Sequence, residues 1–144
     1  MIETHHFRVE WGECDPATIV FYPRYFAWFD EATASLMRIA GQPVADLRKR
    51  YGIVGFPLVS AGADFKSPLA WGDEARVLTG IERIGTASLA LRHLVMKGET
   101  TIAEGRETRV WARQGATEGT LSSGPMPPEV VAALQPFVIR AAGS

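Results

Sequence analysis

The stretch PRYFAWFDEATASLMRIA, residues 23–40, decides how the rest of the chain is organised. Its apolar side chains recur at helical spacing with polar residues between them, and Gly41 follows as a natural end. Pro23 suits the first position of a helix because it needs no amide donor there. The stretch therefore predicts one long helix, and its small alanine side chains allow that helix to approach a sheet closely.

The sequence on both sides of this helix has the character of β-strands. Residues 7–11 alternate apolar and polar side chains, which is the period of a strand with one buried face. Four further β-rich segments, separated by glycine and proline turns, are expected at 58–65, 73–84, 87–96 and 101–112. Short turns favour antiparallel pairing of neighbours in a meander. The expected fold is α+β, with a long central helix against a curved antiparallel sheet.

Shorter elements complete the outline. Residues 44–50 are expected to form another helical turn or two closed by Gly52, and residues 129–134 have helical propensity. The tail from about residue 122 is expected to be peripheral. Because the chain contains no repeat and no long linker, residues 1–144 are expected to form a single domain.

Composition excludes several classes of function. Fifteen Lys+Arg against sixteen Asp+Glu give a net charge of -1, which offers no global attraction for nucleic acid or an anionic membrane. No apolar run reaches the roughly 20 residues that span a bilayer. One cysteine allows no intramolecular disulfide, and the N-terminal residues lack the layout of a secretory signal. A cytoplasmic location is therefore expected.

Asp15 is the most informative acidic residue. It lies in a turn a few residues before the helix that begins around Tyr22 or Pro23. A helix start presents unpaired amide donors and a partial positive charge. If the turn folds back, a carboxylate and an amide donor share one space, which suits acyl transfer, because the carboxylate attacks or activates water while the amide holds the oxyanion. The alternative is that Asp15 only caps the turn before Pro16.

The motif CDPATIVFYPRY, residues 14–25, resembles the signature of the 4-hydroxybenzoyl-CoA thioesterase family, whose fold is the hotdog. The segment GIVGFPLVS at 52–60, the strand that ends in Asp64-Phe65 and the pair Arg92-His93 are also similar to that family. The likeness covers roughly residues 5–115. It implies an acyl-CoA thioesterase whose long helix is wrapped by the sheet and whose pocket lies across a dimer interface.

The same resemblance implies roles for two residues. Asp15 takes the place of the catalytic carboxylate, as nucleophile or general base, and the backbone amide at Tyr22 polarises the thioester carbonyl. Thioester hydrolysis needs no metal and no redox cofactor, and CoA enters as part of the substrate. The expected assembly is a homodimer or a dimer of dimers, with no nucleic-acid and no membrane partner.

The chain departs from the family pattern in two places. Thr18 stands in the tight turn where the family often has glycine, and a β-branched residue restricts the backbone there. Residues 85–87 lack the basic cluster that helps aromatic-acyl members hold the nucleotide phosphates; Lys66, Arg83 and Arg92 are candidate substitutes. An aromatic or short acyl-CoA is favoured, since aromatic-acyl members match best. Two alternatives stay open: a thioesterase for acyl-carrier-protein thioesters, and a non-catalytic acyl-CoA-binding hotdog protein.

The remaining candidates are weaker. Aromatic residues crowd the helix start, and of these Tyr25 and Trp28 are the candidates for an acyl pocket, with Thr18 and Ser60 as further candidate substrate contacts. Cys14 has no histidine in its motif, so a small apolar filler is expected rather than a thiol nucleophile.

Two residues outside the motif are assigned to structure rather than chemistry. His93 in its strand is expected to be packed or hydrogen-bonded rather than a base. Asp30 on the helix is expected to belong to a solvated face, with the pocket of a partner subunit as the alternative.

Overall fold

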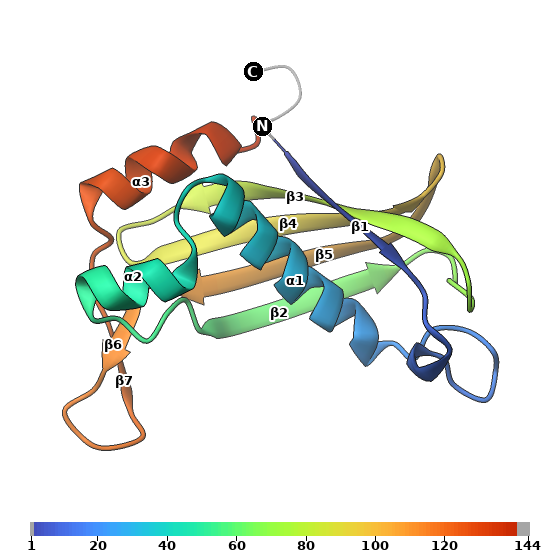
Figure 1. Ribbon diagram of the computed structural model, residues 1–144, viewed down its shortest axis with the longest axis horizontal. Helices are drawn as coiled ribbons and strands as arrows, with labels where there is room; N and C mark the ends of the chain where they lie inside the picture. The colour runs from blue at the N-terminus through green and yellow to red at the C-terminus, as the bar shows by residue number, and fades with distance from the viewer. Residues whose placement is uncertain (1, 141–144) are drawn as a thin grey trace.

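The computed structural model describes residues 2–140 and shows a five-stranded antiparallel sheet that curves around one long helix (Figure 1). In spatial order the strands are β1 (Glu3–Arg8), β3 (Glu74–Ile84), β4 (Ser88–Lys97), β5 (Thr100–Val110) and β2 (Leu58–Phe65). The helix is α1 (Pro23–Ile39). The predicted α+β layout is confirmed. Within the described residues no helix has both the length and the apolar character needed to cross a membrane.

The sheet departs from the expected meander at one connection. Strands β3, β4 and β5 follow one another as antiparallel neighbours, as predicted, but β2 pairs with β5 and lies at the far edge from β1. The segment 66–73 carries the chain from β2 to β3, and its Leu69 is fully buried beneath the start of α1. The meander prediction was wrong here because turn spacing does not determine which strand becomes a neighbour.

The first strand also differs from the expectation. β1 covers Glu3–Arg8, and the residues expected to extend it form a short 3-10 helix, η1 (Trp11–Glu13). Val9 N–H still donates to Asp73 O (2.9 Å), so the backbone pairing of β1 with β3 continues one residue beyond the strand and ends at Val9. Of the alternating residues 7–11, only Phe7 and Arg8 therefore belong to the strand.

α1 buries one face against the sheet. Phe29, Ala32 and Leu36 have no exposed surface. A Cβ at Gly105 of β5 would lie 2.5 Å from the Phe29 ring, so glycine at this strand position is what lets the ring approach the sheet. The helix ends where Gly41 takes a φ of +75°, as its glycine predicted.

The C-terminal third covers the other end of the sheet (Figure 1). The C-terminal elements at this end are the hairpin β6–β7 (Ala112–Gln114 and Leu121–Ser123), α3 (Pro128–Leu134) and η2 (Gln135–Phe137). The short helix α2 (Val44–Tyr51) lies at the same end. Val130 and Leu134 have no exposed surface and pack in one cluster with Trp111. The expectation of a peripheral tail from about residue 122 is therefore wrong for the segment that contains α3, because its apolar face closes the core.

Candidate active site

Asp15 lies in a tight backbone hairpin between β1 and α1. The hairpin is closed by Phe21 N–H donating to Glu13 O (2.8 Å), and nearer its tip by Asp15 N–H donating to Ile19 O (2.9 Å). The Asp15 carboxylate accepts the Ala17 N–H through Oδ1 (2.8 Å). The side chain thus caps the turn, while its second oxygen has no hydrogen bond within residues 2–140.

Thr18 occupies the strained position of this hairpin. Its φ is +67°, and it is the one non-glycine residue with a positive φ in the described part of the chain. The left-handed region costs an L-residue about 1–2 kcal/mol, and a β-branched residue is especially disfavoured there. The expected conflict between Thr18 and the turn is therefore present as backbone strain.

Thr18→Gly is expected to raise the free energy of unfolding by roughly 0.5–1 kcal/mol, because relief of strain exceeds the extra entropy of glycine in the unfolded chain. Urea unfolding of the two proteins measures the difference. Ala17→Gly is the matched control, since its φ is not positive and the added freedom should only destabilise. A Thr18→Gly protein as destabilised as the control would contradict the strain at this position.

The start of α1 presents an unpaired amide next to the hairpin. Tyr22 already has helical dihedral angles (φ −53°, ψ −33°), and Pro23 follows it without an N–H. Within residues 2–140 no hydrogen-bond acceptor is found for the Tyr22 N–H, and the residue is 62% exposed. A free peptide donor with the positive end of a helix dipole therefore lies at the end of the hairpin that carries Asp15.

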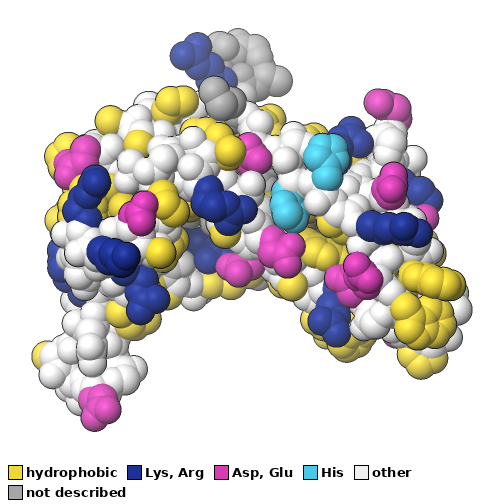
Figure 2. Space-filling model, in the orientation of Figure 1, with side chains coloured by type: hydrophobic (Ala, Val, Ile, Leu, Met, Phe, Trp, Pro, Cys, Tyr) yellow, Lys and Arg dark blue, Asp and Glu magenta, His cyan; other side chains and the backbone are white. Residues whose placement is uncertain are grey.

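A cavity of about 280 Å³ adjoins this helix start, and its lining includes three of the predicted site residues, Tyr22, Tyr25 and Lys66. Trp28 lies in the core instead, 4% exposed. Figure 2 shows hydrophobic side chains gathered at this end of the molecule. Those exposed there include Trp11 and Trp71, whose rings meet edge to face at 5.3 Å.

The structure does not bring the other predicted residues to the helix start of the same chain. Ser60 is exposed on the edge strand β2. Arg83 lies near the end of β3, and because β3 runs antiparallel to β2, that is the end of the sheet opposite Lys66. Arg92 is exposed, 3.9 Å from Glu82, and its strand neighbour His93 faces α1, so Arg92 points to the opposite face.

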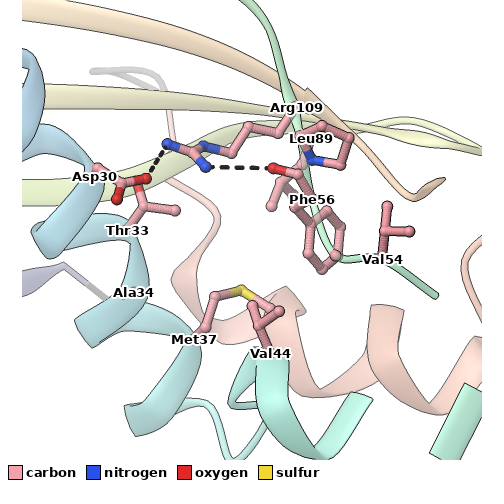
Figure 3. A pocket seen from close by; sticks show the side chains of 11 residues that line it. Asp30, Thr33, Ala34, Met37, Val44, Val54, Phe56, Leu89 and Arg109 are labelled. Atoms are coloured by element: carbon pink, nitrogen blue, oxygen red, sulfur yellow. Dashed lines mark hydrogen bonds and ion pairs between the residues drawn. The ribbon is translucent and has the colours of Figure 1, made fainter. Parts of the chain in front are cut away.

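A second cavity, of about 360 Å³, lies between α1, the start of α2 and residues 54–57 (Figure 3), and of its lining residues only Asp30 was a candidate pocket residue from the sequence. Apolar side chains such as Met37, Val44 and Phe56 form much of its wall, and the polar groups are Asp30, Thr33 and Arg109. The Arg109 guanidinium donates to Asp30 Oδ1 (2.9 Å). Asp30 is solvent-exposed as expected, yet it is ion-paired at the rim of a cavity.

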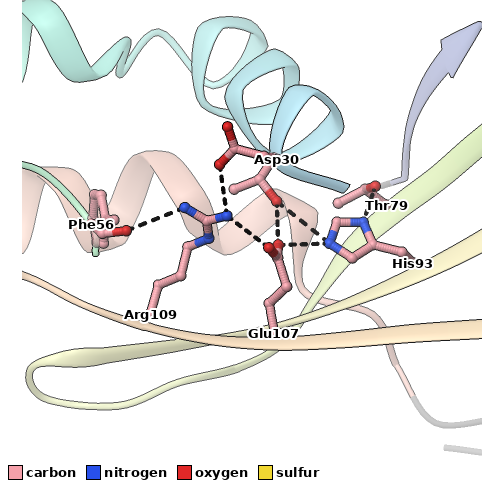
Figure 4. Close-up of polar contacts among 7 residues, drawn as sticks. Asp30, Phe56, Thr79, His93, Glu107 and Arg109 are labelled. Atoms are coloured by element: carbon pink, nitrogen blue, oxygen red, sulfur yellow. Dashed lines mark hydrogen bonds and ion pairs between the residues drawn. The ribbon is translucent and has the colours of Figure 1, made fainter. Parts of the chain in front are cut away.

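Arg109 belongs to a buried polar network that crosses the core (Figure 4). Glu107 accepts hydrogen bonds from Arg109 (2.7 Å) and from Thr33 (2.7 Å). His93 Nε2 lies 2.7 Å from the same carboxylate, and Nδ1 lies 2.7 Å from Thr79 Oγ1. Burial acts to raise the pKa of Glu107, but the bonds to His93 and Arg109 outweigh it and lower the pKa to about 2.

His93 is a packed, hydrogen-bonded residue, which confirms its assignment. It is 2% exposed, and its ring stacks on Phe29 with centroids 4.6 Å apart. Cys14 is half-buried, and its Sγ has one weak contact, to Glu10 O at 3.8 Å.

Comparison with known proteins identifies the family. The sequence profile of the thioesterase-like superfamily matches residues 9–134. The chain belongs to this superfamily. Its sequence is 35% identical over 91 residues to 4-hydroxybenzoyl-CoA thioesterase of Pseudomonas sp. strain CBS-3, a match that covers 62% of this chain and 64% of that relative. The match thus spans slightly less than two thirds of the relative's length.

Solved structures of thioesterases superpose closely on this superfamily member. A variant of 4-hydroxybenzoyl-CoA thioesterase in complex with 4-hydroxybenzoyl-CoA gives a TM-score of 0.86 at 29% identity, covering 92% of this chain and 98% of that one. A gentisyl-coenzyme A thioesterase gives 0.81 at 36% identity, covering 92% and 99%. The hotdog fold implied by the sequence motif is therefore confirmed, as is the resemblance itself.

Proposed function

We propose that this chain hydrolyses the thioester bond of acyl-CoA substrates, with Asp15 as nucleophile or general base and the Tyr22 N–H polarising the carbonyl. The observation that carries the proposal is that a tight hairpin fixes the Asp15 carboxylate and leads directly into a helix start with an unpaired amide. Membership of the thioesterase-like superfamily supports the reaction type. A cytoplasmic location and a homodimer or dimer of dimers belong to the same proposal.

The chemistry follows from these two groups. The Tyr22 N–H donates to the thioester oxygen, whose negative charge grows as the carbonyl carbon becomes tetrahedral. In one route an Asp15 oxygen attacks that carbon, the C–S bond breaks, and water then hydrolyses the mixed anhydride. In the other, Asp15 takes a proton from the attacking water. Both routes release a free acid and a thiol, and neither needs a metal or a redox cofactor.

The cavity lined by Asp30 and Arg109 supports a preference for an aromatic or short acyl group. Its volume of about 360 Å³ is at the small end of ligand pockets. Asp30 follows Tyr22 by eight residues on α1, about 12 Å along the helix axis. A single aromatic acyl group held at Tyr22 is too short to fill the cavity of the same chain, so we propose that it enters the cavity of a partner subunit.

A panel of thioesters tests the proposal. Benzoyl-, hydroxybenzoyl-, acetyl- and palmitoyl-CoA are assayed by detection of the free thiol, beside the same benzoyl group on a carrier protein. We expect kcat/KM for the aromatic CoA thioesters to exceed that for palmitoyl-CoA at least tenfold. It should also exceed kcat/KM for the carrier-bound benzoyl group at least tenfold. Faster hydrolysis of the carrier-bound group favours the carrier-protein alternative. Tight acyl-CoA binding with no hydrolysis of any thioester favours a binding protein and contradicts catalysis.

A further inference from the structure

Glu13 joins three segments around the hairpin that carries Asp15. It ends η1 and lies two residues before Asp15. Glu13 Oε1 accepts the Glu10 N–H (2.8 Å), and Oε2 accepts the indole N–H of Trp28 on α1 (3.1 Å). Its backbone carbonyl accepts the Phe21 N–H at 2.8 Å. Both carboxylate oxygens therefore accept hydrogen bonds, one from the backbone before η1 and one from a side chain of α1.

Trp28 is a rigid anchor for this contact. Its side chain is buried, it stacks on Phe7 with ring centroids 4.1 Å apart, and it meets Tyr25 edge to face at 5.1 Å. It also lies on the helix whose first amide, at Tyr22, is unpaired, about 9 Å farther along the axis. The Glu13–Trp28 bond thus connects the hairpin directly to the helix that presents the free N–H.

The two sides of the hairpin are held in different ways. The returning side is fixed by Val20, which is 5% exposed and whose N–H donates to Leu69 O (2.8 Å). On the outgoing side, Asp15 is exposed in part and Cys14 packs at the edge of the apolar cluster that contains Trp28. Arg24 of α1 also donates a long hydrogen bond to Gly12 O (3.4 Å). The bond from the Trp28 indole N–H to the Glu13 carboxylate (3.1 Å) is the shorter of these two hydrogen bonds to α1, and its donor is buried.

We propose that Glu13 is a positioning residue that fixes the Asp15 carboxylate relative to the Tyr22 N–H by way of Trp28. The inference rests on the proposed function for its kinetic consequence, but the geometry it concerns exists in the free protein. A displacement of about 1 Å at a reacting group can lower a rate a hundredfold. Loss of the Glu13 carboxylate is therefore expected to affect kcat rather than substrate affinity.

Three variants test the role. Glu13→Ala removes both acceptors and is expected to lower kcat at least 30-fold with less than a threefold change in KM. Glu13→Gln keeps an oxygen for the Trp28 indole N–H and is expected to recover most of kcat. Trp28→Phe removes the donor, and combined with Glu13→Ala it should add little, because both changes break one contact. Glu118→Ala, in the exposed loop of the β6–β7 hairpin, is the charge-matched control and should behave as wild type.

Amide hydrogen exchange of the free proteins gives a readout that needs no activity. Exchange of the Asp15 and Phe21 N–H groups is expected to accelerate at least tenfold in Glu13→Ala, to return toward wild type in Glu13→Gln, and to leave the amides of α1 unchanged. Reduced thermal stability with wild-type kcat and unchanged hairpin exchange would overturn the positioning role. If wild type hydrolyses no thioester, the proposed function fails, and the exchange data still decide whether Glu13 holds the hairpin.

Discussion

Asp15→Asn is expected to lower kcat for acyl-CoA hydrolysis by at least about a thousandfold while leaving the fold intact. Asparagine has nearly the same shape, and its carbonyl oxygen can still accept the Ala17 N–H that holds the turn (2.8 Å). Its amide can neither attack a carbonyl nor take a proton from water. Because the reacting group is lost and the hairpin is kept, KM should change much less than kcat.

Initial rates with free-thiol detection, together with thermal unfolding of both proteins, measure this effect. Asp64→Asn is a suitable control, because Asp64 is an exposed strand carboxylate 3.5 Å from Arg106. Turnover like that of wild type in Asp15→Asn would remove Asp15 from the mechanism. A single turnover in heavy-oxygen water then separates the two routes, since label incorporated into Asp15 requires a covalent anhydride.

The elements that could be predicted from the sequence are those with local boundary signals. Pro23 and Gly41 delimit α1 because one lacks a donor that a helix start does not need and the other adopts the left-handed C-terminal conformation. The β2 range of Leu58–Phe65 also agrees with its prediction. The turn at Asp15 and the helix start at Tyr22 were predictable for the same reason, whereas the catalytic roles of these two residues come from the family resemblance and stay predictions.

What could not be predicted depends on contacts between distant segments. Asp30 and Arg109 are 79 residues apart in sequence, so no local pattern relates them. Glu107 occupies an inward position of β5, where alternation alone would predict an apolar residue, and only its three-dimensional neighbours explain its burial. The position of β2 beside β5 is of the same kind, since pairing depends on which edge of the sheet the crossover reaches.

Glu107→Gln is expected to lower the free energy of unfolding by about 3–5 kcal/mol at pH 7, because it removes the buried carboxylate that faces His93 and Arg109. The only ion pair that Arg109 then keeps within residues 2–140 is the one with the exposed Asp30. The Glu107 side chain is 3% exposed, and Arg109 Nη2 lies 2.7 Å from it. Urea denaturation measures the loss. Glu104→Gln is the matched control on the same strand, since it faces the opposite side of the sheet and has no ion pair within residues 2–140. Equal effects of the two variants would contradict the role of the network.

The stability difference between wild type and Glu107→Gln depends on pH. The sign of this dependence follows from the lowered pKa of Glu107, about 2 against 4.5 for a free side chain. Above pH 4.5 the carboxylate is charged in both states, and wild type keeps its full advantage over Glu107→Gln. Between pH 4.5 and 2 the unfolded chain binds a proton that the folded one does not, so the advantage shrinks by up to about 1.4 kcal/mol per pH unit. Near pH 2 it should be largely lost. Subtracting the variant from wild type at each pH removes the contribution of other carboxylates, and a difference that stays constant from pH 7 to 2 would show that His93 and Arg109 do not hold Glu107 in its charged form.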